Sequence, residues 1–600
     1  MLDRVPLSNS PTQMTPRNTS FKKSFNLIKD YFVNSDEKFL AWLMLFGIVS
    51  CVISLVALVV MLTWWSAGFW SVLAAKSLVP FYGCVVEFAK LVTSLICIKV
   101  FKSYLIGKLS INWRNWLTDK IIKDLFEGEN NYLELKRFSA SMDNVAQRIQ
   151  EDTKKVVDLT LGLGTDLLKA VLSLGAFVGT LWVVGGPLSF VVAGLSVVIP
   201  GYLVWVALGI AAVATVATHF IAKSLATRNK KEACTEADLR MDLEMLNNDA
   251  ENIAEEHAEK YYRKSIVNRI KYINANAEKK LNTQSKLVAF QSFYMKISEV
   301  LPYLFSAPLY FAGLIELGQL VQIGMSFGQV NYSLSWFVDA YESLASYNTS
   351  IKRVSKLKNT LELGGISSNP KMIKIKEKNK NRLKIKNLNM MSPDPSDTQY
   401  IMKNLNLKFF PGEHTLIKGK SGLGKSTLFK VISGSWKYGD GCISIPAGKS
   451  MYFLPQKPTL PNDTLRAVLS YPESEETYSN EEYVYALNTI GCMNEFVPKL
   501  DEKRSWSKEL SGGQQQRISF ARALLKKPDW IFLDEATASL DEESEDHVYQ
   551  SVKKIKNTTI VSIAHRRTVE KYHSRIVFFN SNNERQITVS ENKVDESYVC

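Results

Sequence analysis

The chain has 600 residues, and its overall composition is that of an ordinary globular protein. Glycine and proline are sparse, with 31 and 19 residues, and aromatic residues reach 11%, which excludes a disordered or collagen-like chain. The net charge of +14 would also suit a nucleic-acid-binding protein. The cysteines show no C-x-x-C spacing and fit neither a disulfide framework nor a zinc site; they are Cys51, Cys84, Cys97, Cys234, Cys442, Cys492 and Cys600.

Long runs without charge divide the first part of the chain, after a polar stretch at residues 1–36 that lacks the pattern of a signal peptide. Residues 39–75 contain no charged side chain and hold one membrane span, because a span needs about 20 apolar residues. Residues 170–222 are long enough for two spans, with a turn at residues 185–187. Residues 300–338 carry one charge, Glu316, and predict two more spans, divided around residues 318–324.

A sixth span, residues 79–98, carries Glu87 and Lys90. Side chains three residues apart share a helical face, so this pair either forms a salt bridge inside the bundle or faces a wet cavity used in transport. Residues 37–360 are therefore expected to form a membrane domain with six helices. Two charged stretches with helical periodicity, 99–155 and 223–286, predict helices that continue into the cytoplasm and are joined by short coupling turns.

Basic residues gather on one side of the expected spans. The segment after the second span carries Lys99, Lys102 and Lys108 among others, whereas the turns on the other side carry almost no Lys or Arg. Since Lys and Arg mark cytoplasmic loops, both chain ends are expected in the cytoplasm, and residues 1–36 form a cytoplasmic tail with an amphipathic entry segment around residues 21–32.

A basic linker is expected at residues 361–382, followed by a soluble domain at residues 383–600 that is large enough for its own core. Residues 371–386 contain eight basic residues and one acidic residue, Glu377. Such a run could bind nucleic acid or anionic lipid, but we interpret it as a solvated linker that leads into an edge strand.

The soluble domain contains GKSGLGKST between a strand-like and a helix-like segment. Glycines let backbone N–H groups approach phosphates, and the N-terminus of the following helix adds a favourable dipole. Lys425 supplies a positive charge to the phosphates, and the Ser426 hydroxyl is placed to bind Mg²⁺. The predicted ATP-binding residues of this loop are Gly419, Lys420, Ser421, Gly422, Leu423, Gly424, Lys425, Ser426 and Thr427.

Two further apolar, strand-like segments end in residues suited to phosphate chemistry. Asp534 and Glu535 follow residues 530–533, so that Asp534 can serve the metal and Glu535 can polarise the attacking water. His565 follows residues 558–564 at the same kind of strand end and can reach the γ-phosphate. The predicted catalytic residues are Glu535, His565 and Lys425.

The segment LSGGQ, residues 510–514, is extended to QQR and ends at Arg517. Its serine and glycines at the start of a helix form a second anion-binding nest. Because one subunit cannot cradle one ATP with both this segment and residues 419–427, the pair of motifs predicts a head-to-tail dimer with two ATP molecules between the subunits.

Together these motifs resemble the nucleotide-binding domain of ABC transporters, over residues 383 to about 579. The resemblance adds a Q-loop glutamine, Gln456 in FLPQKP, and a D-loop, ASLD, that ends at Asp541. It implies Mg²⁺ ligands at Ser426, Gln456 and Asp534. It also implies ATP contacts from Gln456, Ser511, Gly512, Gly513, Gln514 and Asp541. The aromatic residue that stacks on adenine in this family has no clear counterpart, and Met391, Pro393 and Tyr400 are the candidates.

The membrane half resembles the SbmA/BacA-type transporters, which are bacterial inner-membrane importers of antimicrobial peptides with cobalamin and bleomycin importers among the members that carry a fused ATPase. The resemblance lies in residues 113–118, 148–152, 236–240 and 327–345. Residues 453–472 are also similar to peroxisomal fatty-acyl transporters. These resemblances imply an α-helical, six-span membrane domain of the type IV, exporter-like fold, followed by an α/β P-loop ABC ATPase domain.

The function implied is ATP-driven, inward transport of a hydrophilic or amphipathic solute, peptide-like or cobalamin-like, by a homodimer in the lipid bilayer of the bacterial inner membrane. Polar positions such as Gln329, Asn331 and Ser333 serve either helix packing or substrate contact. Export of a lipid, fatty-acyl compound or drug on the same fold is the alternative. An ABC ATPase acting on DNA or ribosomes is disfavoured by the six spans, and no nucleic acid is expected among the partners.

Overall fold

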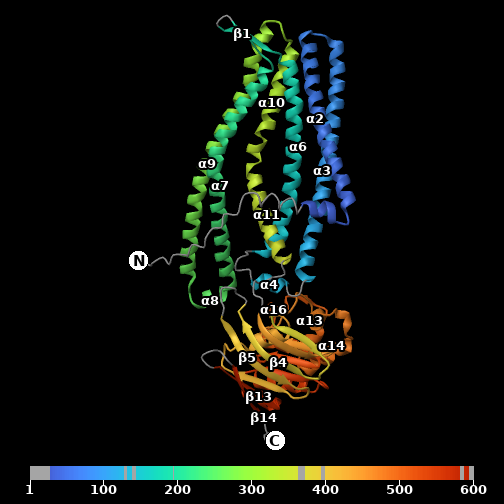
Figure 1. The fold of residues 1–600 in the computed structure, drawn as a ribbon, viewed down its shortest axis with the longest axis vertical. Helices are drawn as coiled ribbons and strands as arrows, with labels where there is room; N and C mark the ends of the chain where they lie inside the picture. The colour runs from blue at the N-terminus through green and yellow to red at the C-terminus, as the bar shows by residue number, and fades with distance from the viewer. Residues whose placement is uncertain are drawn as a thin grey trace, which may run out of the picture. The chain divides into compact units, whose positions relative to one another are not determined.

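A computed structural model of the protein describes residues 28–127, 131–137, 144–192, 195–362, 372–392, 399–581 and 587–593. The chain divides into two compact units (Figure 1). The first contains Met1–Glu127 and Met142–Glu362, and the second contains Gly128–Ser141 and Leu363–Cys600. The predicted tail up to residue 27, Cys600 and Pro393 lie outside the described residues, as does most of the expected entry segment.

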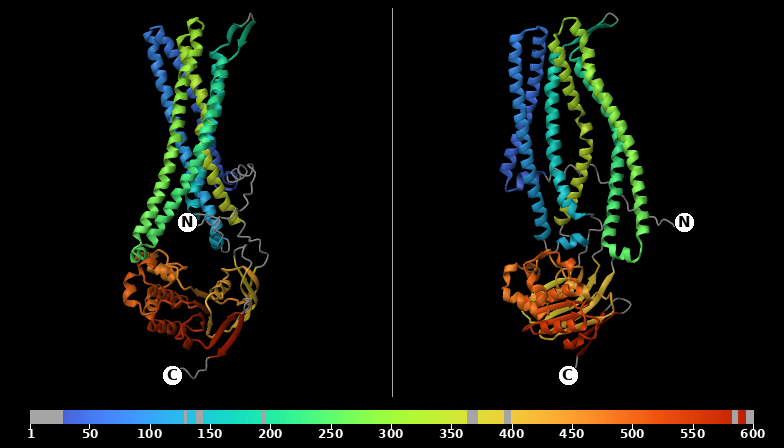
Figure 2. Two further views of the ribbon diagram at one scale, coloured as in Figure 1. Left: turned by 90° about the vertical axis from the view of Figure 1, so that its left-hand side faces the viewer. Right: turned by 180° about the vertical axis from the view of Figure 1, so that it is seen from behind.

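Long helices run alongside one another in the first unit (Figure 2). They pair as hairpins, α2 with α3 and α7 with α9, and α10 packs against α2, α6, α7 and α9. The long helices are α2 (Lys38–Ala74), α3 (Leu78–Glu127), α6 (Thr153–Val184), α7 (Tyr202–Asn248), α9 (Glu259–Phe311), α10 (Leu317–Asp339) and α11 (Tyr341–Glu362). Short elements connect them: α4 (Asn131–Arg137), α5 (Val145–Gln147), the π-helical turn η2 (Arg148–Asp152) and α8 (Ala250–Glu255).

Two helical stretches of the described chain can cross a membrane by length and apolar composition alone. They are Lys38–Ala74 and Val145–Val184, and a shorter apolar stretch is Tyr202–Thr218. The other expected spans lie in α3, α9 and α10. Helices α3, α6, α7 and α9 continue past the expected spans into the charged segments 99–155 and 223–286, as the periodicity of those segments predicted.

The turn predicted at residues 185–187 is only the beginning of a longer connection. Helix α6 ends at Val184, but the chain then forms an antiparallel hairpin of β1 (Leu188–Val192) and β2 (Leu195–Ile199) before α7 begins. The physical reason lies in the sequences LSFVV and LSVVI, whose β-branched and aromatic residues favour strands. A run without charge did not distinguish these strands from helix.

The division predicted around residues 318–324 lies a few residues earlier, at residues 312–316. Helix α9 ends at Phe311, and α10 passes through both glycines of that region. A Cβ atom on Gly318 would lie 2.1 Å from the carbonyl oxygen of Ala67, and one on Gly324 would lie 2.4 Å from the Tyr303 hydroxyl. These glycines therefore allow close helix packing, which is their common role between membrane helices, rather than ending a helix.

The charged and polar residues expected within the spans have different surroundings. Glu87 and Lys90 are both exposed, and among the described residues they form no ion pair, so the predicted salt bridge inside the bundle is absent. Both line a hollow between α2 and α3, beside Trp64 and Trp65. By contrast Asn331 is 5% exposed and accepts a hydrogen bond from the Tyr294 hydroxyl at 3.2 Å, so it joins α10 to α9.

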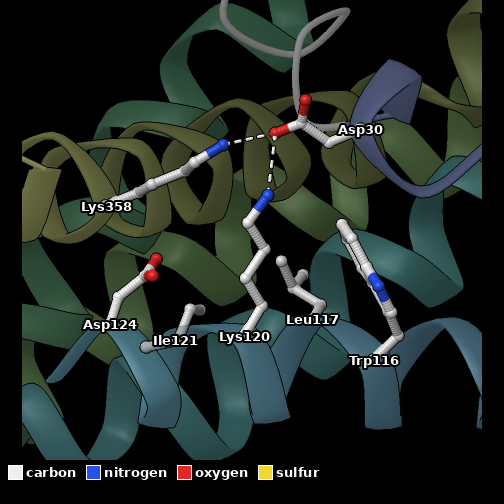
Figure 3. A pocket seen from close by; sticks show the side chains of 7 residues that line it. All are labelled: Asp30, Trp116, Leu117, Lys120, Ile121, Asp124 and Lys358. Carbon is white, nitrogen blue, oxygen red and sulfur yellow. Dashed lines mark hydrogen bonds and ion pairs between the residues drawn. The ribbon is translucent and has the colours of Figure 1, made fainter. Parts of the chain in front are cut away.

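The chain ahead of α2 docks onto two distant helices. Residues 28–34 are helical, and the carboxylate of Asp30 forms ion pairs with Lys120 of α3 and Lys358 of α11 (Figure 3). The Tyr31 ring stacks on Trp113, with centroids 5.4 Å apart. Burial opposes ionisation of Asp30, but the two lysines hold its pKa below the ordinary value.

Two larger sheets form the second unit. The first has six strands in the order β14-β13-β6-β12-β11-β8, and all neighbours are parallel except the antiparallel pair β13 and β14. The second has the order β3-β7-β4-β5. The strands are β3 (Lys374–Lys378), β4 (Leu383–Met391), β5 (Tyr400–Phe409), β6 (Thr415–Gly419), β7 (Gly439–Pro446), β8 (Met451–Leu454), β9 (Asp463–Thr464), β10 (Lys503–Arg504), β11 (Trp530–Asp534), β12 (Thr559–Ile563), β13 (Arg575–Ser581) and β14 (Ile587–Lys593).

The central strand β11 explains why this unit has a continuous core. Trp530 and Phe532 pack in a cluster with the four-stranded sheet, and Ile531 and Leu533 pack in a cluster on the opposite face. A parallel strand covered on both faces requires an unbroken apolar sequence, which WIFL supplies. The helices and helical turns of the unit are α12 (Lys425–Ile432), α13 (Leu465–Ser470), η3 (Glu475–Thr477), α14 (Asn480–Thr489), α15 (Met493–Phe496), η4 (Val497–Lys499), α16 (Trp506–Glu509), α17 (Gly512–Lys526), α18 (Glu542–Lys553) and η5 (Glu570–Tyr572).

Part of the basic run at residues 371–386 already belongs to this unit, ahead of the predicted boundary at residue 383. Residues 374–378 form β3, an edge strand that pairs in parallel with β7, and most of its side chains are exposed. Exposed lysines on an edge strand hinder pairing with another chain. The strand therefore belongs to the fold of the second unit although its composition is that of a solvated linker.

Candidate nucleotide-binding and catalytic site

Four of the predicted motifs follow neighbouring parallel strands. The phosphate loop follows β6, and His565 follows β12. Asp534 is the last residue of β11, Glu535 comes directly after it, and Gln456 follows β8. Because the carboxyl ends of parallel strands lie at one edge of a sheet, the strand order β6-β12-β11-β8 places these motifs side by side. The sheet thus brings together residues that are more than a hundred positions apart in the sequence.

The phosphate loop forms a tight cradle in front of α12. Gly424 caps the helix with φ of 82°, in the left-handed region. A Cβ atom there would lie 2.8 Å from Cγ2 of Ile401 on β5, so the position requires glycine for two reasons. The first N–H groups of α12 are then directed toward an anion at the helix N-terminus.

Lys425 lies under this loop and is 6% exposed. Its Nζ donates hydrogen bonds to the carbonyl oxygens of Gly419 and Lys420, at 2.7 and 2.8 Å. Burial lowers the pKa of Lys425, while the negative charges of Glu535 and Asp534 oppose this effect. The lysine is therefore held in the cradle with a carboxylate pair close by.

The residues present suit a hard cation. The Ser426 hydroxyl donates to Oδ1 of Asp534 at 2.8 Å, so two oxygen ligands converge next to the phosphate cradle. Burial raises the pKa of Asp534, the Ser426 hydrogen bond opposes this rise, and the neighbouring Glu535 adds to it. A divalent cation would offset the cost of this buried charge, and oxygen ligands beside a phosphate are what Mg²⁺ prefers. The backbone carbonyl of Gln456 is joined to α17, and its side chain is exposed.

Glu535 and His565 face one another. Nε2 of His565 lies 3.4 Å from Oε1 of Glu535. Glu535 has φ of 48°, which is uncommon for a residue other than glycine, and its N–H donates to the carbonyl of Ile563 on β12 at 3.0 Å. The backbone of the strand end thus turns the Glu535 carboxylate toward the residue that follows β12.

The LSGGQ segment, residues 510–514, forms the N-terminus of α17 and contains a complete capping box. The Ser511 hydroxyl accepts from the N–H of Gln514 at 3.3 Å, and Oε1 of Gln514 accepts from the N–H of Ser511 at 2.9 Å. Gly512 and Gly513 lie against Ser539 of the D-loop. Asp541 caps α18 by accepting from the N–H of Ser544 at 2.8 Å. Within the described residues no hydrogen bond joins this segment to the phosphate loop.

Three functional candidates were missing from the sequence predictions. Gln516 contacts both the Q-loop and the D-loop, and Arg566 contacts the D-loop from the other side. Glu545 accepts a hydrogen bond from Thr537, the residue before the D-loop. The QQR extension and the arginine after His565 can be read in the sequence, but their position next to known motifs does not tell which residues they contact. Among the candidates for adenine stacking, Met391 and Tyr400 pair across β4 and β5.

The comparisons with known proteins agree with this geometry. Residues 27–311 match the family model of ABC transporter transmembrane region 2, and residues 402–538 match the ABC transporter model. An Escherichia coli relative, the inner membrane ABC transporter ATP-binding protein YddA, is 29% identical, with 90% of this chain and 94% of the relative covered. The mouse lysosomal cobalamin transporter ABCD4 is 23% identical, over 87% of this chain and 88% of its own.

A solved structure of a bacterial Atm1-family ABC exporter with ATP bound has the same fold. Its TM-score is 0.72 at 16% identity, with 92% of this chain and 95% of that chain covered. The fold and the matched models define an ABC transporter, with a helical membrane domain of the type IV fold and an ABC ATPase domain. The chain is an ABC half-transporter: it carries one domain of each kind, binds ATP and couples its hydrolysis to transport.

Proposed function

We propose that the protein is a homodimeric importer of a hydrophilic or amphipathic solute, peptide-like or cobalamin-like, in a bacterial inner membrane. The alignment of four motifs on neighbouring strand ends carries the ATPase part of this proposal. Similarity to an inner-membrane relative and to a cobalamin transporter supports the location and the solute.

In this proposal the residues divide the work of hydrolysis. The loop from Gly419 to Thr427 binds the phosphates with Lys425, and Ser426, Asp534 and Gln456 hold Mg²⁺, which neutralises charge on the phosphate oxygens when bound. Glu535 accepts a proton from the water that attacks the γ-phosphorus, and His565 keeps that carboxylate and the phosphate aligned. Residues 510–514 and Asp541 of the second copy close over the ATP. Closure and reopening of the dimer then shift the membrane helices between two states.

The test of catalysis is the variant Glu535→Gln, which keeps the size of the side chain but cannot take a proton. ATP binding should be retained, while the rate of hydrolysis falls by a factor of roughly 10² to 10⁴. Glu543→Gln, on the exposed first turn of α18, is the matched control and should hydrolyse ATP normally. An unimpaired ATPase in Glu535→Gln would contradict the assignment.

The direction of transport is tested with the same pair of proteins. An importer should take labelled peptide or cobalamin into whole cells, and in inside-out vesicles it should release preloaded solute when ATP is added outside. Both effects should vanish in Glu535→Gln. The alternative, export of a lipid, fatty-acyl compound or drug, has its support in the exporter fold of the solved structure. It predicts ATP-driven accumulation in inside-out vesicles instead.

A further inference from the structure

A single buried amide joins two of the ATPase loops. Gln516 lies on the first turns of α17 and is 3% exposed. Its Nε2 donates to the backbone carbonyl of Gln456 in the Q-loop at 3.3 Å, and its Oε1 accepts from the backbone N–H of Ser539 in the D-loop at 3.0 Å. Both contacts are to backbone atoms, so they depend on the positions of the two loops and not on which side chains the loops carry.

The D-loop is also held from its other side. Arg566, next to His565, donates to the carbonyl oxygens of Leu540 at 2.7 Å and Ala538 at 3.2 Å. The buried carboxylate of Glu545 lies 3.5 Å from this guanidinium. Three consecutive D-loop residues, Ala538, Ser539 and Leu540, are therefore each hydrogen-bonded to a side chain from outside the D-loop. Of these side chains, Gln516 is also hydrogen-bonded to the Q-loop.

We propose that Gln516 is a positioning residue for ATP hydrolysis, which fixes the position of the D-loop relative to the Q-loop within one subunit. The amide suits this role because it offers a donor and an acceptor on one flat group, whereas a carboxylate cannot donate and an ammonium cannot accept. A shift of Gln456 toward or away from the metal side is thereby passed to residues 539–541. This inference rests on the roles proposed for Gln456 and Asp541.

The discriminating variant is Gln516→Glu. It keeps the shape and the acceptor that faces Ser539, but it loses the donor that faces the Gln456 carbonyl. Since the link acts on the geometry of hydrolysis and not on nucleotide affinity, kcat should fall by about tenfold while KM for ATP stays within about twofold. The Kd for ATP, measured in the Glu535→Gln background, should also stay within about twofold of that parent protein.

Ser519→Ala is the matched control. This residue is also buried on α17, but its hydroxyl donates to the carbonyl oxygen of Gln515 within the same helix and reaches neither loop. It should therefore keep the kcat of the wild type. If Gln516→Glu does not fold, Gln516→Met loses both bonds without burying a charge and takes its place.

Equal losses of kcat in the two variants, or a raised KM with unchanged kcat in Gln516→Glu, would overturn the proposal. Failure of the underlying function is a separate result, because it would appear as a full ATPase rate in Glu535→Gln. All measurements use the full chain in detergent or lipid.

Discussion

Lys425 shows how the phosphate cradle is organised before chemistry is considered. An ammonium group has three donors, and two of those on Lys425 are directed to the loop carbonyls of Gly419 and Lys420. These bonds fix the position of the positive charge, while Asp534 and Glu535 help to keep it protonated despite burial. Position and charge state of this lysine are thus set by different neighbours.

His573 gives the ATPase domain a pH-dependent stability. The side chain is 3% exposed, its Nδ1 lies 2.8 Å from the Val569 carbonyl oxygen, and its Nε2 lies 2.8 Å from the Ser562 hydroxyl. Burial lowers the pKa of His573 from 6.5 to about 4. Between these values the unfolded chain binds a proton that the folded protein does not. The stability due to neutral His573 is therefore complete above about pH 6.5 and is lost as the pH falls toward 4.

We predict a loss on the order of 3 kcal/mol from this residue between pH 6.5 and 4. Urea unfolding of the solubilised full chain, followed by hydrogen exchange in residues 559–581, measures it. His573→Gln should flatten that part of the pH dependence, whereas His547→Gln, at an exposed position, should leave it unchanged. An identical pH profile in wild type and His573→Gln would contradict the prediction.

At the residue scale, the sequence predicts the groups proposed to act on phosphate but not those that hold the loops. Asp534 and His565 occur at strand ends, where a change from apolar to polar residues is visible, and Lys425 ends a glycine-rich loop with a recognisable spacing. Gln516 and Glu545 lie within helices, where a polar residue normally faces solvent. Their burial depends on how α17 and α18 pack against the D-loop, which is a tertiary property.

At the scale of elements, the docked segment ahead of α2 is expected to stabilise the membrane domain. Asp30→Asn would leave Lys120 and Lys358 without their shared carboxylate, and Lys358 has only 15% of its side chain exposed. Loss of these ion pairs removes charged contacts that join the segment to α3 and α11, so we predict a destabilisation of about 1–3 kcal/mol.

Thermal unfolding of the full chain tests this expectation. The control is Asp36→Asn, at an exposed position between the docked segment and α2. It should change stability by less than about 0.5 kcal/mol. The stabilisation by Asp30 should be present at neutral pH and should disappear as the pH falls through the lowered pKa of its carboxyl group. Equal stability of both variants would show that the segment is not held by this ion pair.

Helices were easier to predict than the connections between them. The long apolar and charged periodic stretches identified α2, α6 and α7, because a helix of many turns leaves a repeated pattern. The hairpin of β1 and β2 is not predicted, because short apolar strands cannot be distinguished from an apolar helix by the absence of charge alone. The glycines of α10 suggest a division because the residues they pack against lie on α2 and α9, far away in the sequence.

At the scale of the whole molecule, the proposed composite ATP sites make a complementation prediction. Lys425→Ala damages the phosphate loop but keeps residues 510–514, and Ser511→Arg does the reverse. Each homodimer should be inactive, but a mixed dimer contains one intact site. Co-purified chains from coexpression should regain up to about a quarter of the wild-type ATPase rate, since half of the dimers are mixed. A mixture as inactive as its parents would argue against sites shared between subunits.

The two-domain architecture was predictable because each half has its own pattern, namely charge-free runs in one and ordered motifs in the other. The ATPase fold begins before the predicted boundary at residue 383. The strand β3 has the composition of a linker, and only its pairing with β7 shows that it belongs to the ATPase fold. Edge strands are short of apolar residues on both faces, which is why composition fails there.

Helix α3 is 50 residues long and begins at Leu78 with its single proline, Pro80, in the first turn. At about 1.5 Å per residue it spans about 75 Å, well beyond a hydrocarbon core of about 30 Å. A rod of this length that tilts about a point in the bilayer acts as a lever. A tilt of about 5° would carry a tip about 45 Å from the pivot through about 4 Å. Angular changes too small to disturb side-chain packing at the pivot thus become displacements as large as a side chain at the tip.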